Sequence, residues 1–322
     1  MDKVQIRKRP KLKRPFLIVA WPGMGEVAFR AVSHLVDKLK AEPFAQLASE
    51  DFFYLTSSVI QNGILGIPEL PANTFYYWKN KAGENDLIIF LSNAQPDLTK
   101  AEAYSQQIIQ VAKAFKTQMV ISFAAMPQPV DHTQPVNVWV TSTSQELNNT
   151  LKKHNVNFLS DGQISGMNGL FLGIAKREGL AGICLLGEIP LYTIQIENPK
   201  ASGAVLEAFS KITRIQLDLA SLINQAHAME EEINKLLDYL KVGSPSSGPI
   251  SEEDIEKIKK SLGQLVKLPV SIKQKIEDLF TQSGKDISKA GELKAELDKW
   301  SVYKEYEDRF LDLFRKSKDK NN

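Results

Sequence analysis

The sequence is poor in the residues from which covalent cross-links and metal sites are built. It holds a single cysteine, Cys184, and its four histidines lie far apart in the chain. One cysteine cannot form an internal disulfide, and within an apolar run it is most simply a small core residue. No pair of histidines has the spacing of metal ligands, and no cysteine cluster supplies the missing ligands. We therefore expect no metal site.

Long apolar runs and a strong excess of one charge are also missing. No run approaches the ~20 apolar residues of a membrane span. The run at 16–21 follows a basic stretch but is too short for the core of a signal peptide. The formal net charge of +2 argues against a dedicated nucleic-acid binder. We therefore expect a cytoplasmic protein that binds neither membrane nor nucleic acid.

Sequence signatures of catalysis are absent as well. The chain has no P-loop, no H-E-x-x-H and no EF-hand, and Ser165 lies in the wrong frame for a nucleophile elbow. The pair Asp131-His132 is suited to acid–base work, but an isolated loop histidine is more often solvated. We expect no catalytic residue and no cofactor.

One glycine-rich turn formally matches a dinucleotide fingerprint, G-x-G-x-x-A, at Gly23, Gly25 and Ala28. The fingerprint also needs an acidic residue at the end of the next strand, and no clean strand runs into Glu50 and Asp51. A tight structural turn, or a phosphate or peptide site at the start of the next helix, is the preferred interpretation.

Apolar runs alternate with amphipathic helical stretches through the first 200 residues, which is typical of α/β proteins. We expect a three-layer fold with a mostly parallel sheet, because several runs are apolar throughout and fit strands buried on both faces. Strands are expected at 16–21, 44–48, 59–65, 74–78, 87–91, 119–123, 136–140 and 183–186, and helices at 26–39, 99–115, 143–153 and 170–177.

Polar and glycine residues gather in loops where these strands and helices meet. They are Gly23, Gly25, Glu26, Asp161, Gly162, Ser165, Gly166, Asn168, Gly169, Glu188 and Tyr192. Their positions predict a shared crevice for a ligand or partner at the carboxyl edge of the sheet. The alternative is that they cap helices and satisfy backbone N–H groups, each contributing about 1 kcal/mol.

From Lys200 the helical pattern continues to Val242. Within it, apolar residues alternate at four and three positions, which is typical of a coiled-coil seam. The seam residues are Ile215, Leu219, Leu222, Ala226, Met229, Ile233, Leu236 and Leu240. The seam pairs either with a second chain or with the helix after Glu252, folded back across the glycine- and proline-rich linker.

These patterns divide the chain into five parts. Residues 1–14 form a basic tail, expected to be solvated, with phosphate or membrane contact as the alternative. Residues 15–214 form the α/β domain, 215–242 the coiled-coil helix, 243–250 the linker and 251–322 a helical C-terminal region.

Three separated motifs resemble one family. Trp-Pro-Gly-Met-Gly at 21–25, Ser-Asp-Gly-x-x-Ser-Gly-x-Asn-Gly at 160–169 and Leu-Leu-Gly-Glu-x-Pro-x-Tyr at 185–192 are similar to the proteasome assembly chaperone 2 family. The resemblance is to its archaeal and bacterial members, some once described as ATP-grasp-like enzymes, and it covers residues 15–214.

The resemblance implies a core similar to that of purine nucleoside phosphorylase, self-association into homo-oligomers, and a role in assembling proteasome rings. Some relatives dock on the proteasome through a C-terminal tail of hydrophobic residue, tyrosine and any residue, and this chain ends Lys-Asp-Lys-Asn-Asn instead. We expect a non-catalytic assembly chaperone or scaffold. The alternative is a small-molecule enzyme, such as a nucleotide-dependent ligase or a phosphorylase-like hydrolase, that uses the crevice.

Overall fold

The computed structural model describes residues 3–55, 58, 60–154, 156–242, 270–300 and 302–318. The expected linker at 243–250 and the start of the helical region after it lie outside the described residues. The strands are β1 Val4–Ile6, β2 Phe16–Ala20, β3 Glu42–Leu47, β4 Ile60–Gln61, β5 Ile64–Leu65, β6 Asn73–Trp78, β7 Leu87–Ser92, β8 Met119–Gln128, β9 Val138–Ser142, β10 Asn157–Phe158 and β11 Gly182–Pro190. The α-helices are α1 Val27–Leu39, α2 Ala101–Ala114, α3 Gln145–Leu151, α4 Met167–Arg177, α5 Pro199–Thr213, α6 Ala220–Val242, α8 Val270–Lys285, α9 Ala290–Lys299 and α10 Tyr303–Lys318.

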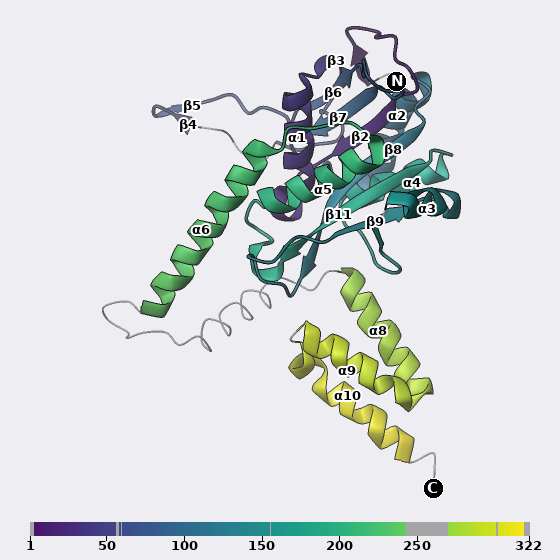
Figure 1. Ribbon diagram of the computed structural model, residues 1–322, viewed down its shortest axis with the longest axis vertical. Coiled ribbons are helices and arrows are strands. Elements are labelled where there is room, and N and C mark those ends of the chain that lie inside the picture. Colours follow the sequence, from purple (N-terminus) through teal and green to yellow (C-terminus); the bar gives the residue numbers. More distant parts are fainter. Residues whose placement is uncertain are drawn as a thin grey trace.

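A nine-stranded sheet forms the centre of the molecule (Figure 1), in the order β1-β3-β6-β7-β2-β8-β11-β9-β10. Its middle strands, β7, β2, β8 and β11, run parallel to one another. They are the apolar runs of the sequence, and their side chains are almost all buried because helices cover both faces.

Helices lie on both faces of the sheet and complete three layers. Helices α1 and α5 pack on one face, where Phe123 and Phe209 share a core. Helices α2 and α4 pack on the other, where Trp21, Tyr104 and Phe171 form an aromatic cluster. None of the helices in the described ranges is long and apolar enough to cross a membrane.

The expectation of a mostly parallel sheet is wrong. In the described sheet, β1–β3, β3–β6, β6–β7 and β9–β11 are antiparallel pairs, so the sheet is mixed. Sequence patterning identifies strands that are buried on both faces. It does not give their direction, because the direction depends on how each connection returns across the sheet.

The amino terminus is not simply a solvated tail. Residues 4–6 form the edge strand β1, which pairs antiparallel with β3, and Val4 is buried. The lysines and arginines around this strand stay at the surface, and Lys8 pairs with Glu42 at 3.3 Å. Charged residues on an edge strand protect it from pairing with other chains.

The strand expected at 59–65 is instead a small hairpin. Strands β4 and β5 pair antiparallel around Asn62 and Gly63, which both adopt positive φ angles of 50° and 77°. An Asn-Gly pair between apolar residues is a strong hairpin signal that the apolar pattern obscured. The hairpin stands away from the sheet, on the same side as α6 (Figure 1).

The single helix expected from Lys200 to Val242 is also wrong, because the chain breaks into α5 and α6. Arg214 adopts a left-handed conformation with φ of 60° and ends α5. The Asp218 carboxylate then accepts a hydrogen bond from the Ala220 N–H at 3.0 Å and starts α6. Helix α6 turns back against α5, and Leu222 lies 3.8 Å from the Cβ position of Gly203.

The C-terminal helices α8, α9 and α10 form a separate apolar core that includes Ile276, Leu293, Leu297 and Trp300. The apolar spacing of the sequence predicts one helix over 293–314, but the structure has two helices there, α9 and α10. In Figure 1 these helices lie beyond the carboxyl ends of the central strands. They therefore face the sheet edge that carries the candidate site.

Two glycines of α4 make a matched test of close packing. At Gly169 an added Cβ would lie 2.4 Å from the Ile164 Cβ and 2.5 Å from its carbonyl oxygen, whereas Gly173 has open space. Gly173→Ala should therefore gain up to about 1 kcal/mol from helix propensity. Gly169→Ala should lose about 1–3 kcal/mol through overpacking. Denaturant unfolding measures both, and equal effects would show that the contact with Ile164 does not constrain the loop.

Candidate functional site

The turn after β2 is held by two amide side chains. Asn168, at the start of α4, accepts a hydrogen bond from the Trp21 N–H at 3.0 Å and donates one to the Trp21 carbonyl at 3.0 Å. Gln95 donates to the Pro22 carbonyl at 2.6 Å and accepts from the Met167 N–H at 3.0 Å. Both amides join the end of β2 to α4, so the motifs at 21–25 and 160–169 meet here.

The same turn is joined on its other side to the segment before α5. The Gly25 N–H donates to the Ile194 carbonyl at 2.8 Å, and the Gly25 carbonyl accepts from the Asn198 N–H at 2.8 Å. The Glu26 N–H bonds within the turn to the Gly23 carbonyl at 2.9 Å. Because these two N–H groups already have partners, neither is a free donor for a phosphate at this turn.

A large cleft opens on the α4 side of the sheet at the carboxyl ends of the central strands. Its volume is ≈ 1420 Å³. One wall consists of the loop before α4, and the opposite wall includes residues of α8 and α9. Seven of the expected crevice residues line it: Gly23, Asp161, Gly162, Ser165, Gly166, Asn168 and Glu188.

The other four expected residues do not line this cleft. Gly25 is buried inside the turn, and Glu26 occupies a left-handed position at the start of α1. Gly169 permits the contact of α4 with Ile164. Tyr192 lies on the other side of the sheet edge, where its hydroxyl accepts from the His132 N–H at 2.9 Å.

The expected strand at 183–186 places Glu188 just beyond its end. In the structure Glu188 instead lies inside β11. It is only 7% exposed. Its carboxylate accepts from the Trp139 Nε1–H at 2.8 Å and from the Asn137 Nδ2–H at 2.9 Å. These two donors, one in the neighbouring strand β9 and one just before it, make it possible to bury a carboxylate within the sheet.

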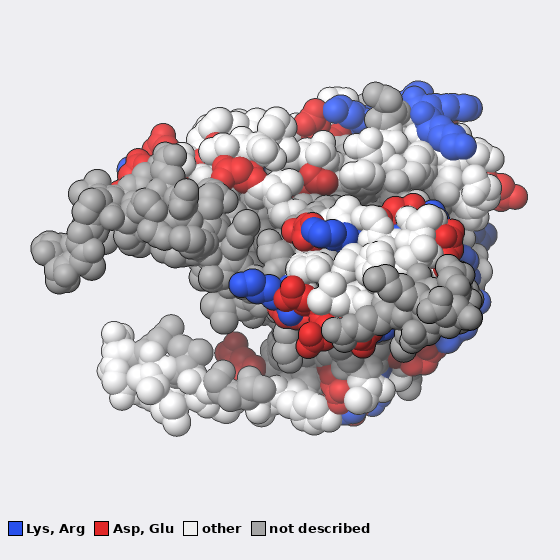
Figure 2. Space-filling view, turned by 90° about the horizontal axis from the view of Figure 1, so that it is seen from below, with Lys and Arg blue, Asp and Glu red and all other residues white. Residues whose placement is uncertain are grey.

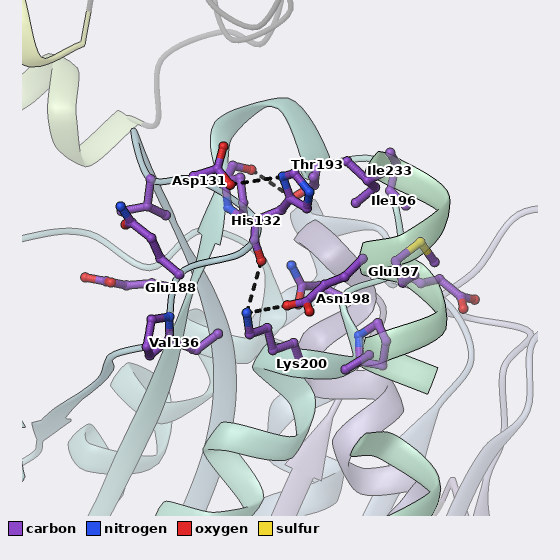
Figure 3. Close-up of a pocket in the computed structure, with 18 residues that line it drawn as sticks. Asp131, His132, Val136, Glu188, Thr193, Ile196, Glu197, Asn198, Lys200 and Ile233 are labelled. Atoms are coloured by element: carbon purple, nitrogen blue, oxygen red, sulfur yellow. Dashed lines mark hydrogen bonds and ion pairs between the residues drawn. The ribbon is translucent and has the colours of Figure 1, made fainter. Parts of the chain in front are cut away.

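A second, smaller cavity lies on the α5 side of the same edge (Figure 3). Its volume is ≈ 30 Å³, enough for about one water molecule. The seam residues Ala226, Met229 and Ile233 line it from α6. Part of the seam therefore faces the protein's own α/β body.

Polar contacts beside this cavity hold α6 to the body. His132 is 7% exposed, and its ring contacts Tyr192 Oη and Asn234 Oδ1, each at 2.9 Å. Lys200 donates to the His132 carbonyl at 3.0 Å and pairs with Glu230 of α6. The expectation that His132 is solvated is wrong. Its partners lie 60 and 102 residues away, so no local pattern reveals its burial.

Burial shifts the pKa of two ionisable groups in this part of the fold. Burial raises the pKa of the Glu26 carboxyl above its usual value. Burial also raises the pKa of the Cys184 thiol to about 12, so at neutral pH it stays protonated and unreactive. Over the part of the chain that the structure describes, no group of three or more His, Cys, Asp or Glu residues is arranged to hold a metal ion.

The three-layer architecture with a cleft at one sheet edge defines an α/β protein, and comparison with known proteins defines the family. A model of the PAC2 family matches residues 17–237. The chain is 31% identical over 252 residues to an uncharacterized protein of Methanocaldococcus jannaschii, covering 77% of this chain and 93% of that protein. The chain belongs to the PAC2 family, and the resemblance drawn from its three motifs is confirmed.

Two solved structures of Pyrococcus furiosus proteins are also similar. PbaB, an archaeal proteasome activator, is 31% identical with a TM-score of 0.64, covering 72% of this chain and 97% of that chain. PbaA, an archaeal homologue of proteasome-assembly chaperone, is 26% identical with a TM-score of 0.56, covering 72% of this chain and 96% of that chain.

The amide of Asn168 is expected to be structural. Asn168→Leu keeps the volume but leaves the buried N–H and carbonyl of Trp21 without partners, at a cost of about 1–3 kcal/mol for each group. We expect the free energy of unfolding to fall by about 2–4 kcal/mol. Ser165→Ala, on the exposed loop before α4, should change it by less than about 0.5 kcal/mol. Urea unfolding measures both variants, and equal free energies of unfolding for Asn168→Leu and Ser165→Ala would contradict this structural role.

Proposed function

We propose that this protein is a non-catalytic, protein-binding assembly chaperone or scaffold that acts on proteasome subunits as a homo-oligomer. Family membership and the similarity to PbaB and PbaA support a protein-binding role. A purine nucleoside phosphorylase-like core and a cytoplasmic location are part of the proposal. So are the boundaries between parts of the chain at residues 215, 243 and 251.

The single observation that carries this proposal is the apolar arm formed by the β4–β5 hairpin. No charged residue occurs between Asp51 and Glu69. Within this stretch Ile60, Ile64 and Ile67 are 68%, 72% and 89% exposed. Figure 2 shows the arm as an uncharged lobe at the lower left that stands off from the rest of the molecule. Apolar surface presented in this way marks a protein interface.

The outer part of the seam supports self-association. Ile215, Leu222 and Ala226 are buried against the α/β body, whereas Leu236 is 60% exposed. The side chain of Leu240 lies outside the described residues. We propose that the first half of the seam pairs within the chain, and that the second half pairs with α6 of another chain as a short coiled coil.

The crevice residues belong to the same proposal. We infer that Gly23, Asp161, Gly162, Ser165, Gly166, Asn168 and Glu188 border a surface for a protein partner. The enzyme alternative has less support, because the N–H groups at Gly25 and Glu26 are already bonded within the protein. In this reading Gly25, Glu26, Gly169 and Tyr192 shape the surface without touching the partner.

Self-association is tested by two leucines of α6. Leu236→Lys places a charge on the exposed half of the seam, and we expect a lower oligomer mass by light scattering with an unchanged melting temperature. Leu222→Ala opens a cavity in the body and should cost about 2–5 kcal/mol. If Leu236→Lys and the wild type have the same oligomer mass, the exposed half of the seam is not part of the interface.

Partner binding is tested with purified proteasome α- and β-subunits from the organism that encodes this chain. Native mass spectrometry should detect a complex with the wild type. The double variant Ile64→Lys, Leu65→Lys should weaken that complex, because charge on the arm opposes its burial. Asn149→Lys, at an exposed position of α3, is the control and should bind as the wild type does. Failure of the wild type to bind would contradict the proposed function.

A further inference from the structure

Glu188 lines both the large cleft and the small cavity beside α5, and the alternation of side chains along β11 directs its carboxylate toward the large cleft. Along β11, Cys184 and Leu186 belong to the core on the α2 and α4 side, and Ile183, Leu185 and Ile189 to the opposite core. Because side chains alternate between faces, Glu188 projects toward α4. Figure 3 agrees, since the Glu188 side chain is directed away from the group of Asp131, His132 and Lys200.

Within the described ranges, Glu188 accepts its side-chain hydrogen bonds from neutral donors. Both carboxylate oxygens act as acceptors, one toward Trp139 and one toward Asn137, which is the bonding pattern of an ionised carboxylate. No described lysine, arginine or histidine forms an ion pair with it. Removing the cation partner of a buried carboxylate is strongly destabilising, so a cation supplied from the cleft that Glu188 lines would stabilise it.

The other charged residues that line the cleft are mostly negative, as Glu188 is, and the walls between them are apolar. Among its described lining residues the carboxylates are Asp161, Glu188, Asp278 and Glu296, and the cation is Lys275, which pairs with Glu296 at 3.0 Å. The walls beside Glu188 are apolar and include Met126, Trp139, Leu159 and Ile164. An apolar stem that ends in a positive charge matches this surface, as in a lysine or arginine side chain.

The size of the cleft favours a peptide segment over a small ligand. Its volume of ≈ 1420 Å³ exceeds the range of about 300–1,000 Å³ typical of small-molecule pockets. It is an open cleft between two walls, one from the loop before α4 and one from α8 and α9. Such a shape admits a chain that enters at one end and leaves at the other.

We propose that the cleft binds a segment of the partner protein through a lysine or arginine side chain that pairs with Glu188. This inference rests on the proposed protein-binding function and deepens it, because it names the chemical feature that the partner presents. Asp161, on the exposed rim, adds a screened and weaker attraction. Glu188 supplies the selectivity, because it is buried beside apolar walls.

The test uses short overlapping peptides from the proteasome subunits described above, with binding measured by fluorescence anisotropy. Each peptide that binds is compared with copies in which lysine is replaced by norleucine or arginine by citrulline. We expect one such replacement to weaken binding to the wild type by about tenfold or more. With Glu188→Gln, the charged and neutral peptides should bind equally. Asp161→Asn should keep the preference for the charged peptide.

A second measurement uses the wild-type chain alone, in case Glu188→Gln fails to fold. A carbodiimide condenses a carboxylate with a lysine amine in direct contact, with loss of water, so a peptide that binds through arginine is tested with lysine in its place. Mass spectrometry should place the cross-link at Glu188. A cross-link confined to Asp161 or Asp278 would overturn the proposal, as would a preference for charge that survives in folded Glu188→Gln.

The outcomes separate this inference from the proposed function. If whole subunits bind but no peptide does, the cleft proposal is wrong and the chaperone proposal stands. If neither binds, both are wrong. Butylamine and spermidine are included as competitors. If these amines bind through Glu188 and no peptide binds, the cleft is a small-amine site and the peptide inference is overturned.

Discussion

The arrangement of the site depends on the backbone hydrogen bonds around the turn after β2. Trp21 is held by Asn168 of α4, and Gly25 is held by the segment that leads into α5. These contacts join helices on opposite faces of the sheet through one short turn. Because the bonded groups are buried or lie at element ends, losing any of them leaves an unpaired polar group. The turn therefore fixes the positions of α4 and of the segment before α5 at the same time.

Strand β11 carries the chemistry of this edge. It pairs parallel with β8 and antiparallel with β9, so it joins the parallel centre of the sheet to its mixed margin. Its neighbour β9 and the residue just before β9 supply the two donors that hold Glu188. The antiparallel pairing, which the sequence did not predict, brings Trp139 and Asn137 beside the carboxylate. A buried charge inside a strand thus becomes stable, and it is presented to the cleft.

Helix α6 is divided between two environments. Near its start, Leu222 and Ala226 lie in the core, and His132 and Lys200 reach it from the body. Farther along, Leu236 is exposed. One regular apolar pattern thus serves first the core and then the solvent-exposed surface. The β4–β5 arm projects from the same side of the molecule as α6 (Figure 1), so these two exposed apolar surfaces lie toward one side.

The sequence by itself determined which segments are buried strands, which are amphipathic helices and which glycine-rich loops carry the family motifs. These features follow from local periodicity and from the conformational freedom of glycine, and both can be read within a few residues. The tertiary structure alone decided four matters: the direction of the outer strands, the fold-back of α6, the burial of His132 and the position of Glu188 within β11. Asp218 and the Asn62-Gly63 pair were local signals that a stronger apolar pattern hid. For His132 and Glu188 no local signal exists, because the energy of burying a polar group depends on its partners, and these lie 49 to 102 residues away in the chain.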